Sequence, residues 1–232
     1  MIIDVMPVPV SKSSVTSAAF ESSTAEAPGR ADELQRRIID EHACDHPLST
    51  RVIGFACGRL RREGDNMRLV SIWGEARDEA SALALANKML TKHRCPTVSF
   101  VGGQRIPHLL LARMLFSGDR CRLAETTFLR RHVDLADVAS CGRAFALPTR
   151  EEALAAVGVS LRPDKLSRAG IAAADQLRDE DALLRELSLR IEELAVLYAR
   201  LCFQPRATVI GATSGTISVM DRNWMDRVAA GW

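Results

Sequence analysis

Apolar and polar positions recur along this chain with periods that predict both strands and helices. Residues 1–10 are rich in Ile, Val and Met and predict a buried first strand, which Pro7 and Pro9 would end. Residues 51–61 and 67–74 are apolar-rich and are separated by a short charged turn that contains glycine. This pattern is typical of a β-hairpin, so the first third of the chain predicts three strands.

The middle of the chain changes to helical spacing. Residues 78–93 carry apolar side chains on one helical face and lead through Cys95-Pro96 into a strand at residues 97–101. Residues 108–116 fit a second helix, and residues 133–135 fit a short strand or the entry to a helix. Strands and helices therefore alternate in this region.

Two more helices are predicted in the last third. Thr149 precedes Glu152 by three residues, the spacing of a capping box, which predicts a helix over 149–157 that Gly158 ends. Residues 179–203 have a broad apolar face at helical spacing and predict one long amphipathic helix.

The same patterns predict one domain over residues 1–203 and a Gly- and Ser-rich tail over residues 204–232. Residues 11–30 are dominated by Ser, Thr, Ala, Glu and Pro, which favours a mobile loop, and residues 31–42 favour a short amphipathic helix. The expected fold class is α/β, with a mixed sheet flanked by helices.

Composition narrows the class of protein only slightly. The 31 basic and 29 acidic residues give a net charge of +2, so a polyanion partner would need a local basic face. The six cysteines are spread singly, without zinc spacing, and are expected to be reduced thiols. The apolar start is too short for a signal sequence and no apolar run could span a bilayer, so we expect a cytoplasmic location and no membrane partner.

The first predicted strand carries the motif MIIDVMPVP over residues 1–9. It resembles the first motif of predicted 3′-5′ exonucleases related to the proofreading domain of family B DNA polymerases. In that motif an Asp, and a Glu two residues later, hold metal. Asp4 stands at the Asp position and Met6 at the Glu position. The resemblance implies a ribonuclease H-like fold.

Three later segments extend the resemblance. Residues 99–107, SFVGGQRIP, resemble a second motif in which Val101 replaces an Asn and Arg105 replaces an Asp. Residues 132–137, HVDLAD, resemble the family's His-x-Asp-Leu segment, and residues 147–165 resemble its next helix and turn. The third motif places a Tyr four residues before an Asp on the last long helix.

That third motif is effectively lost, because the last helix offers only Glu192 and Glu193 and no Tyr upstream of them. A two-metal nuclease needs several converging carboxylates. Arg105 stands where the second motif has an Asp, so it would bring positive charge to the place where a metal ion would bind. The pattern therefore predicts weak or absent catalysis and no metal site. The remnant catalytic positions are Asp4, Asp134 and Glu192.

Each remnant has an ordinary structural interpretation. Asp4 fits a turn-capping or exposed residue, Asp134 fits a structural hydrogen-bonding residue, and Glu192 and Glu193 fit a solvated helix face. Five arginines are candidates for contacts with a nucleic-acid backbone, and each could also be an ordinary solvent-exposed residue. They are Arg105, Arg120, Arg122, Arg130 and Arg131. A second basic cluster lies around the predicted hairpin: Arg59, Arg61, Arg62 and Arg68.

Three functions remain open at this point. The first is a catalytically degenerate exonuclease-like protein that binds nucleic acid, DNA rather than RNA, or serves as a subunit of a nucleic-acid-processing complex. The second is an active 3′-5′ exonuclease with a rearranged site, the only one that would need Mg²⁺ or Mn²⁺. The third is a protein-interaction subunit without nucleic-acid contact. No cofactor is expected for the first and third.

Overall fold

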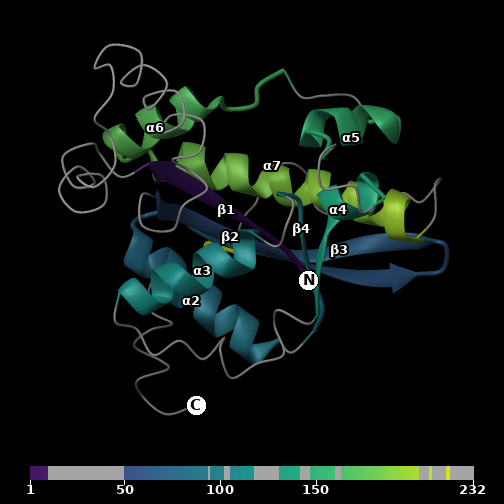
Figure 1. Ribbon diagram of the computed structural model, residues 1–232, viewed down its shortest axis with the longest axis horizontal. Coiled ribbons are helices and arrows are strands. Elements are labelled where there is room, and N and C mark those ends of the chain that lie inside the picture. The colour runs from purple at the N-terminus through teal and green to yellow at the C-terminus, as the bar shows by residue number, and fades with distance from the viewer. Residues whose placement is uncertain are drawn as a thin grey trace, which may run out of the picture.

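The structure, a computed structural model, describes residues 1–9, 50–93, 95–101, 105–117, 131–141, 147–159, 163–203, 209–210 and 218–219. These residues form an α/β fold in which helices cover both faces of a mixed sheet (Figure 1). The fold class predicted from the sequence is confirmed at this level. The main strands are β1 (Ile2–Pro9), β2 (Thr50–Glu63), β3 (Asn66–Glu75), β4 (Thr97–Ser99) and β5 (His132–Asp134). The helices are α2 (Glu79–Lys92), α3 (Arg105–Phe116), α4 (Leu135–Ala139), α5 (Arg150–Ala156), α6 (Arg168–Leu177) and α7 (Glu180–Tyr198).

The sheet has the strand order β5-β4-β1-β2-β3. β1 pairs with β2 in antiparallel and with β4 in parallel orientation, β4 pairs with β5 in parallel, and β2 pairs with β3 in antiparallel. Among these five strands, β2 therefore runs opposite to the other four. Two short strands, β6 (Val209–Ile210) and β7 (Ser218–Val219), both pair in parallel with β3, so two parts of the predicted tail dock on the sheet.

Most of the predicted elements are present. The hairpin turns at Gly64, whose φ of 60° is a backbone conformation that favours glycine. The capping box at the start of α5 is formed, with reciprocal contacts between Thr149 and Glu152. Asp179 caps α7, which continues beyond Tyr198 as a π-helical turn, η3 (Ala199–Phe203).

Two predictions were wrong or incomplete. Pro7 does not end the first strand, and β1 continues to Pro9. Proline has no backbone N–H, and the register shift between Met6 and Pro7 accommodates this missing hydrogen-bond donor. The sequence did not predict α6, whose ten residues bury only Ile171 and Ala174 as hydrophobic contacts. The predicted loop at residues 11–30 and the predicted helix at residues 31–42 lie outside the described residues.

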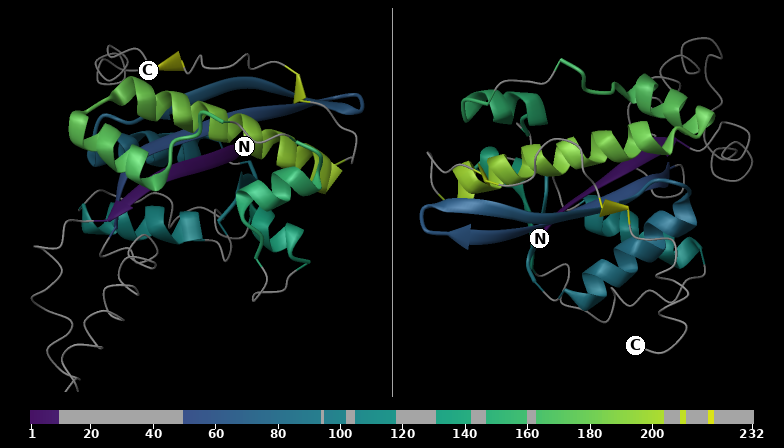
Figure 2. Two further views of the ribbon diagram at one scale, coloured as in Figure 1. Left: turned by 90° about the horizontal axis from the view of Figure 1, so that it is seen from above. Right: turned by 180° about the vertical axis from the view of Figure 1, so that it is seen from behind.

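The core has two halves, one on each face of the sheet. α7 packs over one face, where Ile2 and Met6 of β1 are buried, and α2 and α3 pack over the other, where Ile3 and Val5 are buried. Figure 2 shows the sheet between these two helical layers. Alternation of side chains along β1 thus divides this strand between two cores.

Gly54 and Gly58 of β2 allow α7 to approach the sheet closely. A Cβ atom built on Gly54 would lie 2.9 Å from Leu187 Cδ1, and one built on Gly58 would lie 2.5 Å from Ile191 Cγ2. Both distances are shorter than real carbon contacts, so side chains at these two positions would force the packed side chains of α7 to shift.

Gly58→Ala is therefore expected to lower the free energy of unfolding by about 1–3 kcal/mol through overpacking. Gly170→Ala is the matched control, because a Cβ there meets its nearest atoms at 3.5 Å, an ordinary contact. In the α6 helix that change should stabilise the protein by about 0.4–1 kcal/mol. Urea unfolding of the two variants measures both effects, and equal destabilisation would contradict the close α7 approach.

Among the described residues, no helix combines the length and the apolar composition that crossing a bilayer requires.

Candidate functional site: a buried ion-pair cluster

Asp4 is a carboxylate inside the sheet. It lies between Ile2 and Met6 on β1, and both of these neighbours pack in the core under α7, so alternation points Asp4 to the same face. Its exposed fraction is 2%. Its Oδ1 accepts a hydrogen bond from the Val5 N–H at 3.0 Å. A buried carboxylate in an apolar face needs a further partner.

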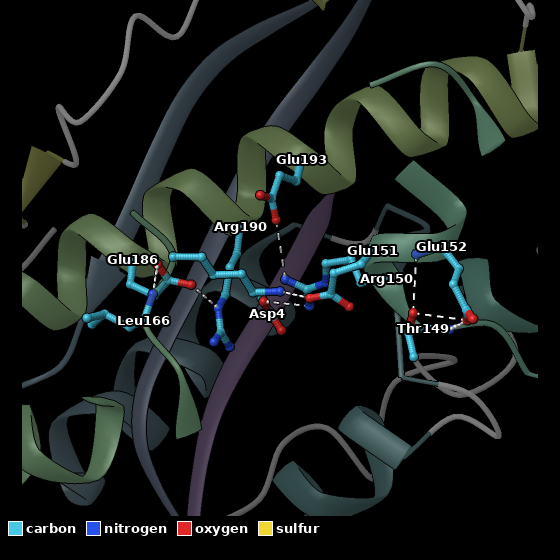
Figure 3. Close-up of polar contacts among 10 residues, drawn as sticks. Asp4, Thr149, Arg150, Glu151, Glu152, Leu166, Glu186, Arg190 and Glu193 are labelled. Carbon is cyan, nitrogen blue, oxygen red and sulfur yellow. Dashed lines mark hydrogen bonds and ion pairs between the residues drawn. The ribbon is translucent and has the colours of Figure 1, made fainter. Parts of the chain in front are cut away.

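That partner is Arg150, the first residue of α5. Its Nη2 donates to Asp4 Oδ2 at 3.0 Å, and its Nη1 lies 4.0 Å from Glu193 Oε2 on α7 (Figure 3). The three side chains are almost enclosed, with exposed fractions of 12% for Arg150 and 10% for Glu193. One guanidinium therefore bridges a carboxylate of the first strand and a carboxylate of the last long helix.

The position of Arg150 is unusual for a cation. It occupies the first turn of a helix, where the helix dipole favours acidic side chains. Burial alone would lower the pKa of Arg150, but the charge and hydrogen bond of Asp4, together with Glu193 and Glu151, raise that pKa above its ordinary value. The guanidinium thus stays charged, and the two acids outweigh the unfavourable dipole.

Further charged pairs continue the cluster along α7 and α5. Buried Glu186 accepts hydrogen bonds from Arg190 Nε at 2.8 Å and from the Leu166 N–H at 3.3 Å. Glu151 pairs with Lys165 (Figure 3). Burial opposes ionisation of Glu151, but the hydrogen bond and charge of Lys165 lower the pKa of that carboxyl overall.

This arrangement does not fit a divalent metal centre. A divalent ion needs oxygen ligands at about 2.0–2.6 Å, whereas the space between Asp4 and Glu193 is taken by the Arg150 side chain. At an effective dielectric constant of about 20, two unit charges at 4 Å repel by about 4 kcal/mol, and a divalent ion doubles that. Within the described part of the chain, no group of three or more His, Cys, Asp or Glu side chains is arranged to hold a metal ion.

The structure does not bring Asp134 to this cluster. Val98 pairs with both Ile2 and Val133, and Val98 and Val133 pack in the core under α7. The next residue, Asp134, therefore points to the opposite face of the sheet from Asp4. Its Oδ1 accepts from the Ala136 N–H at 3.0 Å and the Val101 N–H at 3.2 Å, so it caps α4.

Beside Asp134 lies a buried histidine. His132 Nδ1 is 2.9 Å from Thr97 Oγ1, and its Nε2 is 2.9 Å from Ser99 Oγ. Burial, opposed in part by Asp137, lowers the pKa of His132 to about 4. Ser99 is completely buried, so this serine and histidine form an internal hydrogen-bonded group rather than an accessible nucleophile and base.

The last helix departs from the sequence interpretation. Glu192 and Glu193 do not form a solvated face, because both are largely shielded from solvent and Glu193 reaches Arg150. Of the two, Glu193 is the acid that faces Asp4 across the guanidinium. Asp4 likewise lies neither at a turn nor in solvent, since it is buried within β1.

The candidate nucleic-acid arginines are only partly described. Arg120, Arg122 and Arg130 lie outside the described residues. Arg105 begins α3, and Arg131 is exposed just before β5. The structure therefore neither gathers these arginines into one surface nor separates them.

Arg150 is the site residue that the sequence interpretation missed. The capping box was predicted, and it places Arg150 at the first position of α5, but this position was assigned no role. The available signal was a basic residue in a helical first turn, where a compensating acid is needed. The sequence offered no sign of which acids would supply it, because Asp4 and Glu193 are distant along the chain.

A scan against models of known families, a search of curated proteins and a search of solved structures each found no match to this chain. Inferences about its function therefore rest on its own residues and geometry.

Proposed function

We propose that this protein is a ribonuclease H-like domain of the exonuclease type that has lost its metal site and binds nucleic acid without cleaving it. Two observations on the fold support the proposal. The strand order β3-β2-β1-β4-β5, with β2 antiparallel to the rest, is the arrangement expected of a ribonuclease H-like sheet. The Asp of the first motif, Asp4, lies on the central strand of that sheet.

The observation that carries the proposal is the guanidinium of Arg150 between Asp4 and Glu193. These acids come from the first strand and the last long helix, the two elements on which the resembled family carries its first and third motifs. Here they face a protein cation instead of metal ions. A side chain that is covalently attached and always charged cannot activate water as a bound metal does. Binding without cleavage is the function that such a site supports best.

We expect no shortening of a labelled single-stranded DNA by the purified chain in Mg²⁺ or Mn²⁺, together with measurable binding of the same DNA at low salt. Denaturing gels measure cleavage, and fluorescence anisotropy measures binding. Asp4→Asn is the control, because it removes the remnant acid of the first motif while keeping its shape.

Two outcomes would contradict the proposal in different ways. If the chain shortens the DNA in the presence of metal, and Asp4→Asn abolishes this activity, the protein is an active exonuclease. Absence of binding to single-stranded and duplex nucleic acid alike, even at low salt, would leave the role of a protein-interaction subunit in its place.

A further inference from the structure

Toward its turn, the β2–β3 hairpin has one face packed against the end of α7 and an opposite face that carries exposed arginines. Beyond Gly58, β2 pairs with β3 and no longer with β1, and the turn end extends past the helices (Figures 1 and 2). On one face, Leu60 and Met67 pack against Ala199 and Tyr198 at the end of α7. Register and alternation place the arginines of the hairpin on the other face: Arg59, Arg61 and Arg68.

These three arginines concentrate positive charge on one face of the hairpin. All are exposed, and Arg61 lies directly opposite Arg68 in the antiparallel register, a like-charged pair that destabilises a sheet. Arg68 is bridged to Glu63, with Nε 2.7 Å from Oε1. Among the described residues, the side chains of Arg59 and Arg61 make neither an ion pair nor a hydrogen bond.

The end of α2 continues this positive surface. His93 stacks on Trp73 of β3, with ring centroids 6.2 Å apart, which holds the end of α2 beside the hairpin. Burial, and then the charges of Lys92, Arg59 and the N-terminal amine, lower the pKa of His93. The pKa of Lys88 is also lowered, mainly by burial and in addition by the charge of Lys92. Positive charges from three segments therefore act together at one place.

We call this surface the basic hairpin face, and it consists of Arg59, Arg61, Arg68, Lys88 and Lys92. On the described hairpin, Glu63 is the acid that pairs with this face, through Arg68. The whole chain has a net charge of only +2, so the excess is local. Arg59 and Arg61 are two residues apart on one strand, which spaces them about 6–7 Å apart.

We propose that the basic hairpin face binds the phosphate backbone of a nucleic acid, an inference that rests on the proposed function. Arginine forks pair with phosphate oxygens, and a polyanion relieves the repulsion between Arg61 and Arg68. Protein interfaces have an apolar centre, whereas the only large apolar side chain exposed in the described hairpin is Val70. This face is the one opposite α7, so the nucleic acid lies on the other side of the sheet from Asp4 and Arg150.

The test replaces all three hairpin arginines in the full chain, as Arg59→Gln, Arg61→Gln and Arg68→Gln together. Fluorescence anisotropy with a labelled single strand and a labelled duplex, over about 50–200 mM NaCl, measures affinity and its salt slope. We expect affinity to fall about tenfold or more. The salt slope for the single strand should decrease by about 2, since each lost phosphate contact removes about 0.7.

The matched control removes the same charge elsewhere, by glutamine replacement of three exposed arginines on the α6–α7 side: Arg168, Arg178 and Arg185. This variant should keep its affinity for the nucleic acid within about threefold. If net charge alone determined binding, the control would lose as much affinity as the hairpin variant. Circular dichroism and thermal unfolding verify that both variants are folded, as expected for exposed side chains.

The outcomes separate the two proposals. If the unmodified chain binds nucleic acid and the hairpin variant binds equally well, or if both variants lose the same affinity, the basic hairpin face is not the binding surface. If polyglutamate competes as effectively as DNA, the surface takes acidic polypeptides and the nucleic-acid assignment is overturned. If the unmodified chain binds no nucleic acid, the proposed function itself fails.

Discussion

Replacement of Arg150 by methionine is expected to lower the free energy of unfolding by about 3–5 kcal/mol, the typical cost of removing one partner of a buried ion pair. Methionine keeps most of the side-chain volume, so the loss reports on charge rather than on a cavity. Asp4, which is 2% exposed, would lose the guanidinium that donates to it at 3.0 Å. Urea unfolding near neutral pH measures the effect.

Arg168→Met is the matched control for this experiment. Arg168 is also the first residue of a helix and also follows a hydroxyl cap, Ser167, but its side chain is exposed. Its replacement should change stability by no more than about 0.5 kcal/mol. Any difference between the two variants therefore measures burial and pairing, not the helix position.

A double-mutant cycle with Asp4→Asn identifies the partner. If Arg150 and Asp4 stabilise each other, the double variant should cost less than the sum of the two single variants, by about 1–3 kcal/mol. Arg150→Lys keeps the charge without the fork and should fall between the native protein and Arg150→Met. Additive costs, or a loss no larger than that of Arg168→Met, would contradict the bridge between Asp4 and Glu193.

The second large effect is an acid-induced loss of stability that depends on His132. Folding lowers the pKa of this histidine from 6.5 to about 4, mainly by burial. Below about pH 6.5 the unfolded chain binds a proton that the folded chain does not take up until about pH 4, so stability falls as the pH falls through this window. The expected loss between about pH 7 and pH 4 is about 3 kcal/mol.

His132→Gln separates this effect from the carboxylates that also titrate in acid. Glutamine can still bond the hydroxyls of Thr97 and Ser99 but carries no titrating group in this range. The measurement is the free energy of unfolding of both proteins across this pH window. We expect the variant to lose less stability in acid than the native protein. Parallel pH curves would show that the imidazole does not contribute.

Ion pairs and hydrogen bonds join helices to both faces of the sheet. On the α7 face, Arg150 ties α5 to β1 and α7, so the cluster fixes the position of three elements. On the other face, Glu79 of α2 receives two hydrogen bonds from Arg113 of α3, at 2.8 Å and 2.6 Å, and one from the Val52 N–H at 2.7 Å. Both groups hold helices on the sheet.

Local patterns in the sequence predicted much of the fold. The hairpin, α2, the capped α5 and the long α7 depend on period, turn residues and caps, which neighbours along the chain determine. α6 was missed because only two of its hydrophobic residues, Ile171 and Ala174, are buried, which gives a weak helical pattern in the sequence. Pro7 was misjudged because a strand continues past a proline when its register shifts, which depends on the partner strand.

The sequence by itself determined that Asp4 lies on a strand, that Glu193 lies on a long helix and that Arg150 follows a helix cap, because each of these depends on residues a few positions away. Only the tertiary structure decided that these three side chains meet, that Asp134 points to the opposite face, and that Arg59, Arg61 and Arg68 share one face of the hairpin. The physical reason is that charge interactions act through space at a few ångströms, whereas these partners are up to 189 residues apart along the chain, from Asp4 to Glu193.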